Sequence, residues 1–167
     1  MHIVIAPDSF KGTLSSKQII EIVSAEAHLH FPEAKITGVP IADGGEGTVQ
    51  AVLASCGGRT RHIAVTNPLF EQVDAAYGIM ENIDGSLSAI IEMAAASGLT
   101  LLPAAQRNAL ITTSYGTGEL IADALRQGIK DITIAVGGSA TNDGGAGAMA
   151  ALGFRFLDEN GRDVTPT

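Results

Sequence analysis

Short apolar runs alternate with amphipathic runs along the first third of the chain. Residues 2–7 and 35–41 are brief and rich in β-branched side chains, a pattern typical of buried strands. After the first of these runs, Ser15 stands three residues before Gln18, the spacing of a helix capping box, and apolar residues at helical spacing follow. Residues 48–56 form a second helical run. This strand–helix–strand–helix order predicts parallel strands and a Rossmann- or flavodoxin-like start.

The pattern changes beyond residue 60. Strand-like runs are separated by Asn67-Pro68 and by a turn-rich stretch at 82–86; they comprise residues 61–66, 72–80 and 87–93. Such closely spaced runs indicate antiparallel or mixed pairing. We therefore expect an α/β fold of two α/β subdomains with a parallel or mixed sheet. The predicted division lies between residues 1–66 and 67–167, and the second part carries the mixed strands.

The C-terminal part returns to the α/β pattern. Residues 119–128 predict a helix ending in glycine, and residues 131–136 predict a strand. A long glycine-rich loop, 137–147, leads to a short predicted helix at 148–153. Asn160-Gly161 then favours a hairpin with a type I′ turn.

Composition and charge narrow the class of protein. The 167 residues are 46% hydrophobic and 17% charged, and the net charge of −8 argues against a nucleic-acid partner or an anionic membrane surface. A single cysteine, Cys56, excludes an internal disulfide. No apolar run approaches the roughly 18 residues that span a bilayer, and the N-terminus lacks a signal-peptide pattern. These features lead us to expect a cytoplasmic enzyme or binding domain.

Three loops follow predicted strands and precede predicted helices: residues 8–12, 43–48 and 137–147. In open α/β sheets, ligands bind at such positions. The second and third loops share the pattern D-G-G-x-G, and successive glycine amides at a helix start let an anion approach closely. Because a helix terminus contributes only about 0.3–1 kcal/mol at an exposed site, such a cradle also requires a lysine or a metal ion.

The same loops carry the charged groups that phosphate chemistry requires. Lys11 is the one basic residue in them, while Asp8, Asp43, Glu46 and Asp143 offer the oxygen ligands that Mg²⁺ prefers. Together these groups indicate phosphoryl transfer, a reaction that relies on positioning and charge neutralisation. A carboxylate can also accept the proton of the attacking hydroxyl.

Structural explanations compete with these hypotheses. Loop 8–12 fits an ordinary turn, and acids at the start of helix 48–56 stabilise it without a ligand. Loop 137–147 fits a flexible surface segment. Glu92 ends an apolar strand and therefore needs a partner, either in a site or in a buried salt bridge. Thr117 is explained more simply as a helix N-cap than as a ligand.

A dinucleotide fingerprint is the weakest alternative. Residues 145–150 fit G-x-G-x-x-A. However, the predicted strand ends near Val136, too far upstream for the tight turn that the fingerprint requires, and no acid follows at the expected distance.

Five ordered sequence blocks together resemble the bacterial-type (class I) glycerate kinase family. These blocks are IVIAPDSFKG (3–12), ADGGEGT (42–48), EMAAASGL (92–99), TTSYGTGELI (112–121) and GGSATNDGGAGAMAALG (137–153). The resemblance implies an ATP- and Mg²⁺-dependent kinase that phosphorylates D-glycerate, usually to 2-phosphoglycerate. It also implies two α/β domains with the site in the cleft between them.

The resemblance assigns roles to particular residues, although it leaves open which loop meets ATP and which meets glycerate. Catalytic candidates are Asp43, Lys11 and Asp143; metal candidates are Asp43, Glu46 and Asp143. Candidates for binding ATP or the substrate, through backbone amides or orienting side chains, are Asp8, Ser9, Gly44, Gly45, Gly47, Gly137, Gly138, Ser139, Thr141 and Asn142. D-Glycerate is the expected partner, with neither nucleic acid nor membrane, and a homodimer stays open.

Several features depart from the family pattern. Asn67, Phe70 and Ala109 stand where glycine or proline is usual, which puts local turn geometry in doubt. Family members continue well beyond this length, so the chain is expected to be an N-terminal fragment that is inactive alone. A non-catalytic anion-binding module is the main alternative, and a dinucleotide-binding oxidoreductase is a weaker one.

Overall fold

The computed structural model describes residues 1–10 and 13–164, which divide into two compact units. The first unit comprises residues 1–43 and the second comprises residues 44–167. Lys11, a predicted site residue, lies outside the described residues.

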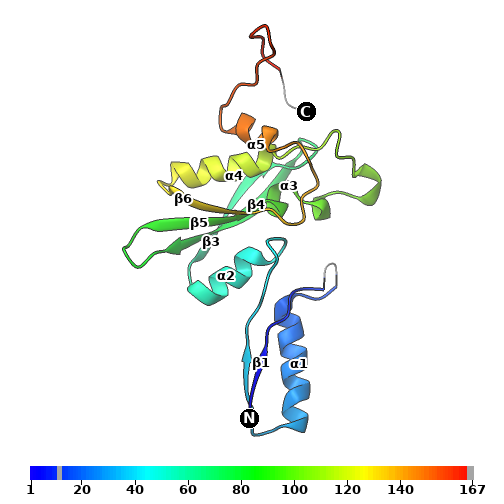
Figure 1. The fold of residues 1–167 in the computed structure, drawn as a ribbon, viewed down its shortest axis with the longest axis vertical. Helices are drawn as coiled ribbons and strands as arrows, with labels where there is room; N and C mark the ends of the chain where they lie inside the picture. Colours follow the sequence, from blue (N-terminus) through cyan, green and yellow to red (C-terminus); the bar gives the residue numbers. More distant parts are fainter. Residues whose placement is uncertain (11–12, 165–167) are drawn as a thin grey trace. The chain divides into compact units, whose positions relative to one another are not determined.

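The first unit is a strand–helix–strand element (Figure 1). Strands β1 (His2–Ile5) and β2 (Lys35–Gly38) pair in parallel, and α1 (Ser16–His30) connects them. The predicted capping box is confirmed: Ser15 Oγ accepts from the Gln18 amide at 3.3 Å, and Gln18 Oε1 accepts from the Ser15 amide at 2.9 Å. The predicted parallel pairing at this end of the chain is also confirmed.

The second unit contains a four-stranded sheet of order β3-β4-β5-β6. Its strands are β3 (Arg59–Thr66), β4 (Gln72–Glu81), β5 (Leu87–Glu92) and β6 (Asp131–Ala135). The pairs β3–β4 and β4–β5 are antiparallel, whereas β5–β6 is parallel. This arrangement confirms the predicted mixed sheet and, with the first unit, the α/β class.

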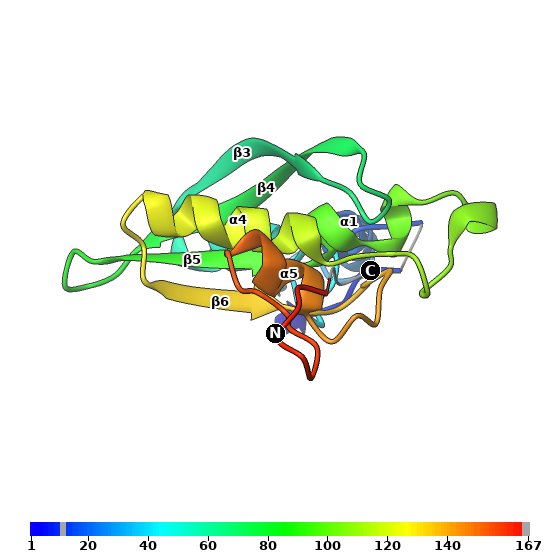
Figure 2. The ribbon, with the colours of Figure 1, turned by 90° about the horizontal axis from the view of Figure 1, so that it is seen from above.

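Helices cover both faces of this sheet (Figures 1 and 2). Helix α4 (Tyr115–Arg126), which links β5 to β6, packs on one face, and α2 (Thr48–Cys56) packs on the other. Successive side chains of β4 point to opposite faces of the sheet. Tyr77 and Ile79 point to the α4 side and join the core that contains Leu120 of α4. Gly78 instead faces α2, where a Cβ would lie 3.2 Å from the Val49 side chain.

Short helical segments complete the second unit. They are α3 (Ala94–Ser97), the 3₁₀ turns η1 (Leu99–Leu101) and η2 (Ala104–Gln106), and α5 (Ala146–Ala151). Helix α5 packs against α4, and the approach is close because a Cβ at Gly118 would lie 2.3 Å from the Ala148 carbonyl oxygen. Nowhere in residues 1–10 and 13–164 is there a helix long and apolar enough to cross a membrane.

The two compact units divide at a different point from the predicted subdomains. The prediction placed the division after residue 66, where the sequence pattern changes from alternating strands and helices to closely spaced strands. In the structure, every residue of β3 pairs with β4, from Arg59 opposite Ile79 to Thr66 opposite Gln72, so the two strands share one sheet. The first residue of the second compact unit is Gly44.

Two local predictions were wrong. Helix α4 begins at Tyr115 with Ser114 as N-cap, so Thr117 lies inside the first turn and its hydroxyl contacts Ser97 at 2.8 Å instead. The turn at Asn160 is not type I′, because Phe70 is the only non-glycine residue with positive φ in the described part of the chain. The Asp158 amide donates to the Arg162 carbonyl, and Gly161 alone is left-handed, as in a three-residue hairpin loop.

A buried carboxylate joins α4 to the sheet. Asp123, whose side chain is 8% exposed, accepts from Arg61 Nε at 2.6 Å and from Arg61 Nη2 at 3.1 Å. The hydroxyl of Tyr77 donates to the same carboxylate at 2.8 Å. These hydrogen bonds, led by the one from Arg61, lower the pKa of Asp123. Burial and the bond to Asp123 raise the pKa of Tyr77 to about 12.

We expect Asp123→Asn to lower the free energy of unfolding by about 2–4 kcal/mol, because it leaves Arg61 without its charged partner. Asp131→Asn, at the exposed start of β6, is the matched control and should change little. Because the folded pKa of Asp123 is lowered, its contribution is complete at neutral pH and is lost as the pH falls below about 4. Denaturant titrations between pH 3 and 7 measure the loss of stability in Asp123→Asn and its dependence on pH. Equal stability of Asp123→Asn and Asp131→Asn at pH 7 would contradict the expected loss.

Candidate functional site

Two glycine-rich loops of the second unit cross each other at the carboxyl end of β6. The Gly137 amide donates to the Gly44 carbonyl at 2.8 Å. A Cβ at Gly137 would lie only 2.5 Å from the Gly45 nitrogen, so the two backbones touch directly. The sequence echo therefore corresponds to a spatial pair, and glycine is required at 137 for close approach.

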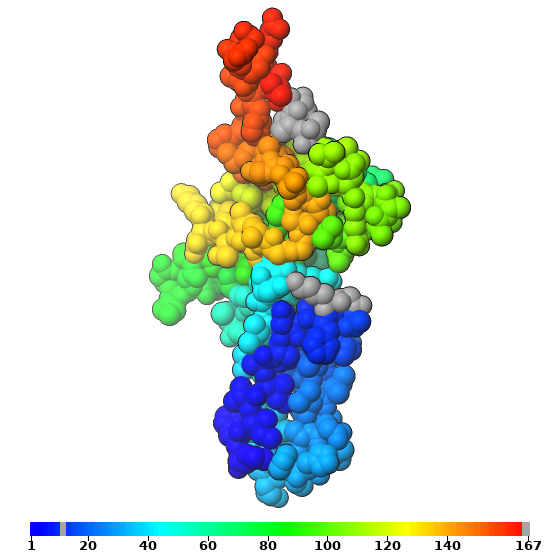
Figure 3. All heavy atoms as spheres, turned by 45° about the vertical axis from the view of Figure 1, so that its right-hand side comes forward, coloured from blue at the N-terminus to red at the C-terminus, as the bar shows by residue number. Residues whose placement is uncertain are grey.

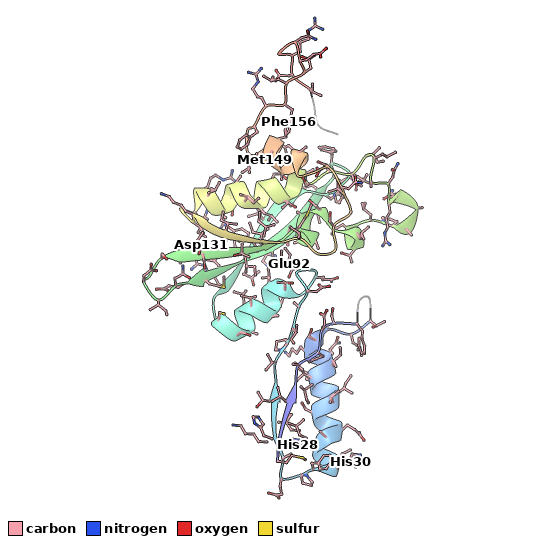
Figure 4. All side chains as sticks on the ribbon, viewed as in Figure 1. His28, His30, Glu92, Asp131, Met149 and Phe156 are labelled. Atoms are coloured by element: carbon pink, nitrogen blue, oxygen red, sulfur yellow. The ribbon has the colours of Figure 1, made fainter. Side chains whose placement is uncertain are left out.

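Glu92 lies at the end of β5 beside the start of α2 (Figure 4). Its carboxylate, on a residue only 6% exposed, accepts from the Val49 amide at 2.6 Å, and the amides of Gly47 and Thr48 also stabilise its charge. Burial raises the pKa of Glu92 against the effect of these amides. Among the described residues it forms no salt bridge, so its partner is the N-terminus of a helix rather than a cation.

Asp143 is held in a comparable way at the start of α5. Its carboxylate accepts from the amide and the hydroxyl of Ser114, both at 2.8 Å, and from the amides of Gly145 at 2.9 Å and Gly147 at 3.1 Å. Burial opposes its ionisation, but these hydrogen bonds outweigh burial and lower the pKa of Asp143. The carboxylate thus connects the beginnings of α4 and α5.

Buried and half-buried hydroxyl groups fix the loop between β6 and α5. The Thr141 hydroxyl donates to the Thr112 carbonyl at 2.7 Å, and the Thr112 hydroxyl donates to the Ala140 carbonyl at 2.8 Å. The Ser139 hydroxyl donates to the Thr141 carbonyl at 2.9 Å. Figure 3 shows this loop, in orange, at the surface next to the green segment 99–111. These bonds are inconsistent with the alternative of an untethered flexible loop.

The two echoing motifs differ in register relative to their helices. The N-cap of α2 is Gly47 (φ 94°), the fifth residue of its motif, whereas the N-cap of α5 is Gly145 (φ 82°), the third. Gly147 is buried inside α5, where a Cβ would lie 2.1 Å from Thr113 Oγ1. This glycine of the suspected dinucleotide fingerprint therefore serves helix packing.

Four of the six amides that were predicted to bind anions fall into two groups. Those of Gly47 and Gly137 already have partners within the protein, Glu92 and the Gly44 carbonyl. In contrast, none of the hydrogen bonds formed within residues 1–10 and 13–164 uses the amide of Gly138 or Ser139. Gly138 is also exposed and left-handed, with φ of 74°.

The remaining predicted residues lie at exposed or turn positions. Glu46, Asp43 and Asn142 are exposed. In the first unit, Asp8 Oδ1 accepts from the Ser9 amide at 2.7 Å. No group of three or more His, Cys, Asp or Glu residues able to hold a metal ion occurs in the part of the chain that the structure describes.

Sequence reasoning missed two features of this region. Ser114, whose hydroxyl also accepts from the Ala148 amide at 2.9 Å, received no role, although the run of hydroxyl residues 112–114 was a signal. The partner of Glu92 was missed because the α2 amides lie 43 positions away in the sequence. The rule that a buried acid needs a partner identified the residue but could not identify the partner.

The fold and the site define an α/β protein with glycine-rich loops gathered at the carboxyl ends of strands, the usual place for a small ligand. Comparison with known sequences is more specific: residues 3–167 match the glycerate kinase family model, and the chain belongs to this family.

Relatives from several bacteria support the assignment. The chain is 52% identical over 164 residues to the glycerate 2-kinase of Escherichia coli K12 and 51% identical over 166 residues to the glycerate kinase of Bacillus subtilis 168. These alignments cover 98% and 99% of this chain but 42% and 43% of the relatives.

A solved structure gives the same result. The crystal structure of a protein from Salmonella typhimurium LT2, described as a candidate glycerate kinase 2, matches with a TM-score of 0.77 at 50% identity. The match covers 99% of this chain and 43% of that one. The chain therefore spans less than half the length of the relatives it matches.

We expect Asp143→Ala to lower the free energy of unfolding by about 2–4 kcal/mol, because several buried donors, including the Ser114 hydroxyl, lose a charged acceptor. Asn142→Ala, at the exposed neighbouring position, is the matched control and should stay within about 0.5 kcal/mol of the parent. Urea titrations of both variants measure the difference. Comparable stability of the two variants would show that the Asp143 hydrogen bonds contribute nothing measurable.

Proposed function

We propose that this chain supplies part of a glycerate kinase, which transfers the γ-phosphate of ATP to a hydroxyl of D-glycerate and forms 2-phosphoglycerate. The observation that carries the proposal is the family match over residues 3–167, with relatives at about half identity. The name of the Escherichia coli relative, glycerate 2-kinase, favours the 2-phosphate product. The crossing of the two glycine loops supports a small-ligand site.

Within the second unit, the amides of Gly138 and Ser139 are the proposed anion-binding groups. These two amides are the better backbone candidates because they have no partner among the described residues. Thr141 and Asn142, which follow in the same loop, are proposed to orient the bound groups. In the first unit, Lys11, which lies outside the described residues, is proposed as an anion-binding residue from its sequence motif. Also in the first unit, the Asp8 carboxylate accepts from the Ser9 amide, and both residues are proposed to orient bound groups.

Metal binding falls to Asp43 and Glu46, which stand three positions apart and are both exposed. One or two carboxylates with phosphate oxygens and waters satisfy Mg²⁺, so this donor set fits the ion. Bound Mg²⁺ would neutralise charge on the transferred phosphate. Asp43 is also the candidate base for the attacking hydroxyl. Asp143 was predicted for the same tasks, but its four hydrogen bonds favour a role in holding the loop.

A chimera tests the proposed function with this chain's own residues. The matching segment of the Escherichia coli glycerate 2-kinase is replaced by residues 3–167, and ADP release is measured with D-glycerate. We expect glycerate-dependent ADP release by the chimera and none by the 167-residue chain alone, because the chain spans less than half of its relatives. NMR of the product distinguishes the 2-phosphate from the 3-phosphate. A folded chimera that binds phosphate but releases no ADP would support the non-catalytic anion-binding module.

In the same chimera, we expect Asp43→Asn to lower kcat by about 10²-fold or more, because the loss removes a charge that acts in the transition state. The unfolding midpoint is measured beside kcat, so that a loss of turnover is separated from a loss of stability. Asp131→Asn is the matched exposed control and should keep the parent's turnover. Turnover by Asp43→Asn close to that of the parent would rule out both the metal and the base role.

A further inference from the structure

We propose that Glu92 is a positioning residue that holds the glycine loop 44–47 and, through it, the exposed Glu46. The effect of Glu92 on turnover rests on the proposed function, whereas its effect on the loop does not. Nothing in the sequence pattern or in the comparisons assigns this role. It follows from where the strand ends and from which amides meet the carboxylate.

Strand pairing holds the backbone of Glu92 in place, independently of what its side chain contacts. Glu92 is the last residue of β5 and pairs with Ala135 of β6, whose carbonyl accepts from the Met93 amide at 2.8 Å. A side chain that starts from a paired interior strand has little freedom, and this one is buried. The carboxylate can therefore serve as a rigid reference point for whatever it binds.

The start of α2 needs such an acceptor. Its N-cap is Gly47, which has no side chain to bond the first amides. The Thr48 amide donates to the Gly45 carbonyl at 3.2 Å, whereas the amide of the buried Val49 needs an acceptor from another element. A buried amide without an acceptor destabilises the folded state. Glu92 supplies both an acceptor, at 2.6 Å from the Val49 nitrogen, and the negative charge that a helix N-terminus favours.

The same contact immobilises the loop that precedes the helix. At its other end, the Gly44 carbonyl accepts from the Gly137 amide at 2.8 Å, and within it the Gly45 carbonyl accepts from the Thr48 hydroxyl at 2.7 Å. Glu46 lies between these anchors and is exposed. Without Glu92, the segment Gly47–Val49 loses its anchor and Glu46 is no longer held at one place.

Amide hydrogen exchange on the 167-residue chain, followed by NMR, tests the anchoring. In Glu92→Leu, protection at Val49 should fall at least about tenfold, because its hydrogen bond to a charged group is lost, and protection at the neighbouring Gly47 should fall with it. Glu92→Gln keeps an oxygen acceptor, and in this variant the protection of the same amides should fall about fivefold. This second variant allows the measurement even if Glu92→Leu does not fold.

Glu119→Gln is the matched control. Glu119 also accepts a backbone amide, that of Thr66 at 2.6 Å, but it lies on α4. This variant should alter protection at Thr66 and leave Gly47–Val49 unchanged. Unchanged protection at Gly47–Val49 in both Glu92 variants, or an equal change in Glu119→Gln, would overturn the proposal.

Kinetics of the chimera separate positioning from general stability. Glu92→Leu should lower kcat at least about tenfold with KM for glycerate changed by less than about threefold, since misplaced charges act on the transition state. Glu92→Gln should recover most of this loss, and Glu119→Gln should show none. If the parent chimera releases no ADP, the proposed function fails, but the exchange measurement still decides the role of Glu92 because it needs no substrate. Parent-like kcat in Glu92→Leu would limit Glu92 to helix stability and overturn its positioning of Glu46.

Discussion

The starts of two helices in the second unit depend on internal carboxylates. Helices α2 and α5 both begin after a left-handed glycine that offers no side-chain cap, so their first amides need acceptors from elsewhere. Glu92 meets the amides of α2 from the end of a neighbouring strand, and Asp143 meets those of α5 from within the preceding loop. Since both loops end at these helices, the geometry of the candidate site rests on the two carboxylates.

Because the protein's own carboxylates bind these helix starts, the glycines before them have a structural role as well as the predicted role in ligand binding. A glycine-rich loop before a helix suggests an anion cradle, and here the protein's own acids occupy much of that cradle. Other glycines allow elements to touch: a Cβ at Gly116 would lie 1.8 Å from the Thr66 carbonyl oxygen, and one at Gly137 would meet the Gly45 backbone. The amides of the exposed Gly138 and the half-buried Ser139 have no hydrogen-bond partner among the described residues. The glycine-rich motifs therefore serve close packing and the binding of the protein's own carboxylates.

Local signals in the sequence predicted much of the fold. The capping box at Ser15, the parallel start and the mixed sheet all follow from patterns a few residues long. Signals that depend on distant partners failed. Thr117 looked like an N-cap, but tertiary packing starts α4 at Tyr115, and Thr117 is buried against Ser97. The division predicted after residue 66 is a separate matter: it was placed where the sequence pattern changes, and every residue of β3 pairs with β4 across it.

The sequence by itself determined the class of fold, the glycerate kinase family and the loops in which ligand-binding residues should be sought. Those conclusions depend on periodicity and on ordered motifs, which are local properties of the chain. Only the tertiary structure decided what each acid contacts. Glu92 and Asp143 are both acids near glycine-rich loops, but burial and backbone amides engage them, while Glu46 stays exposed. The reason is physical: a carboxylate's role depends on the donors around it, and elements far apart in the sequence supply those donors.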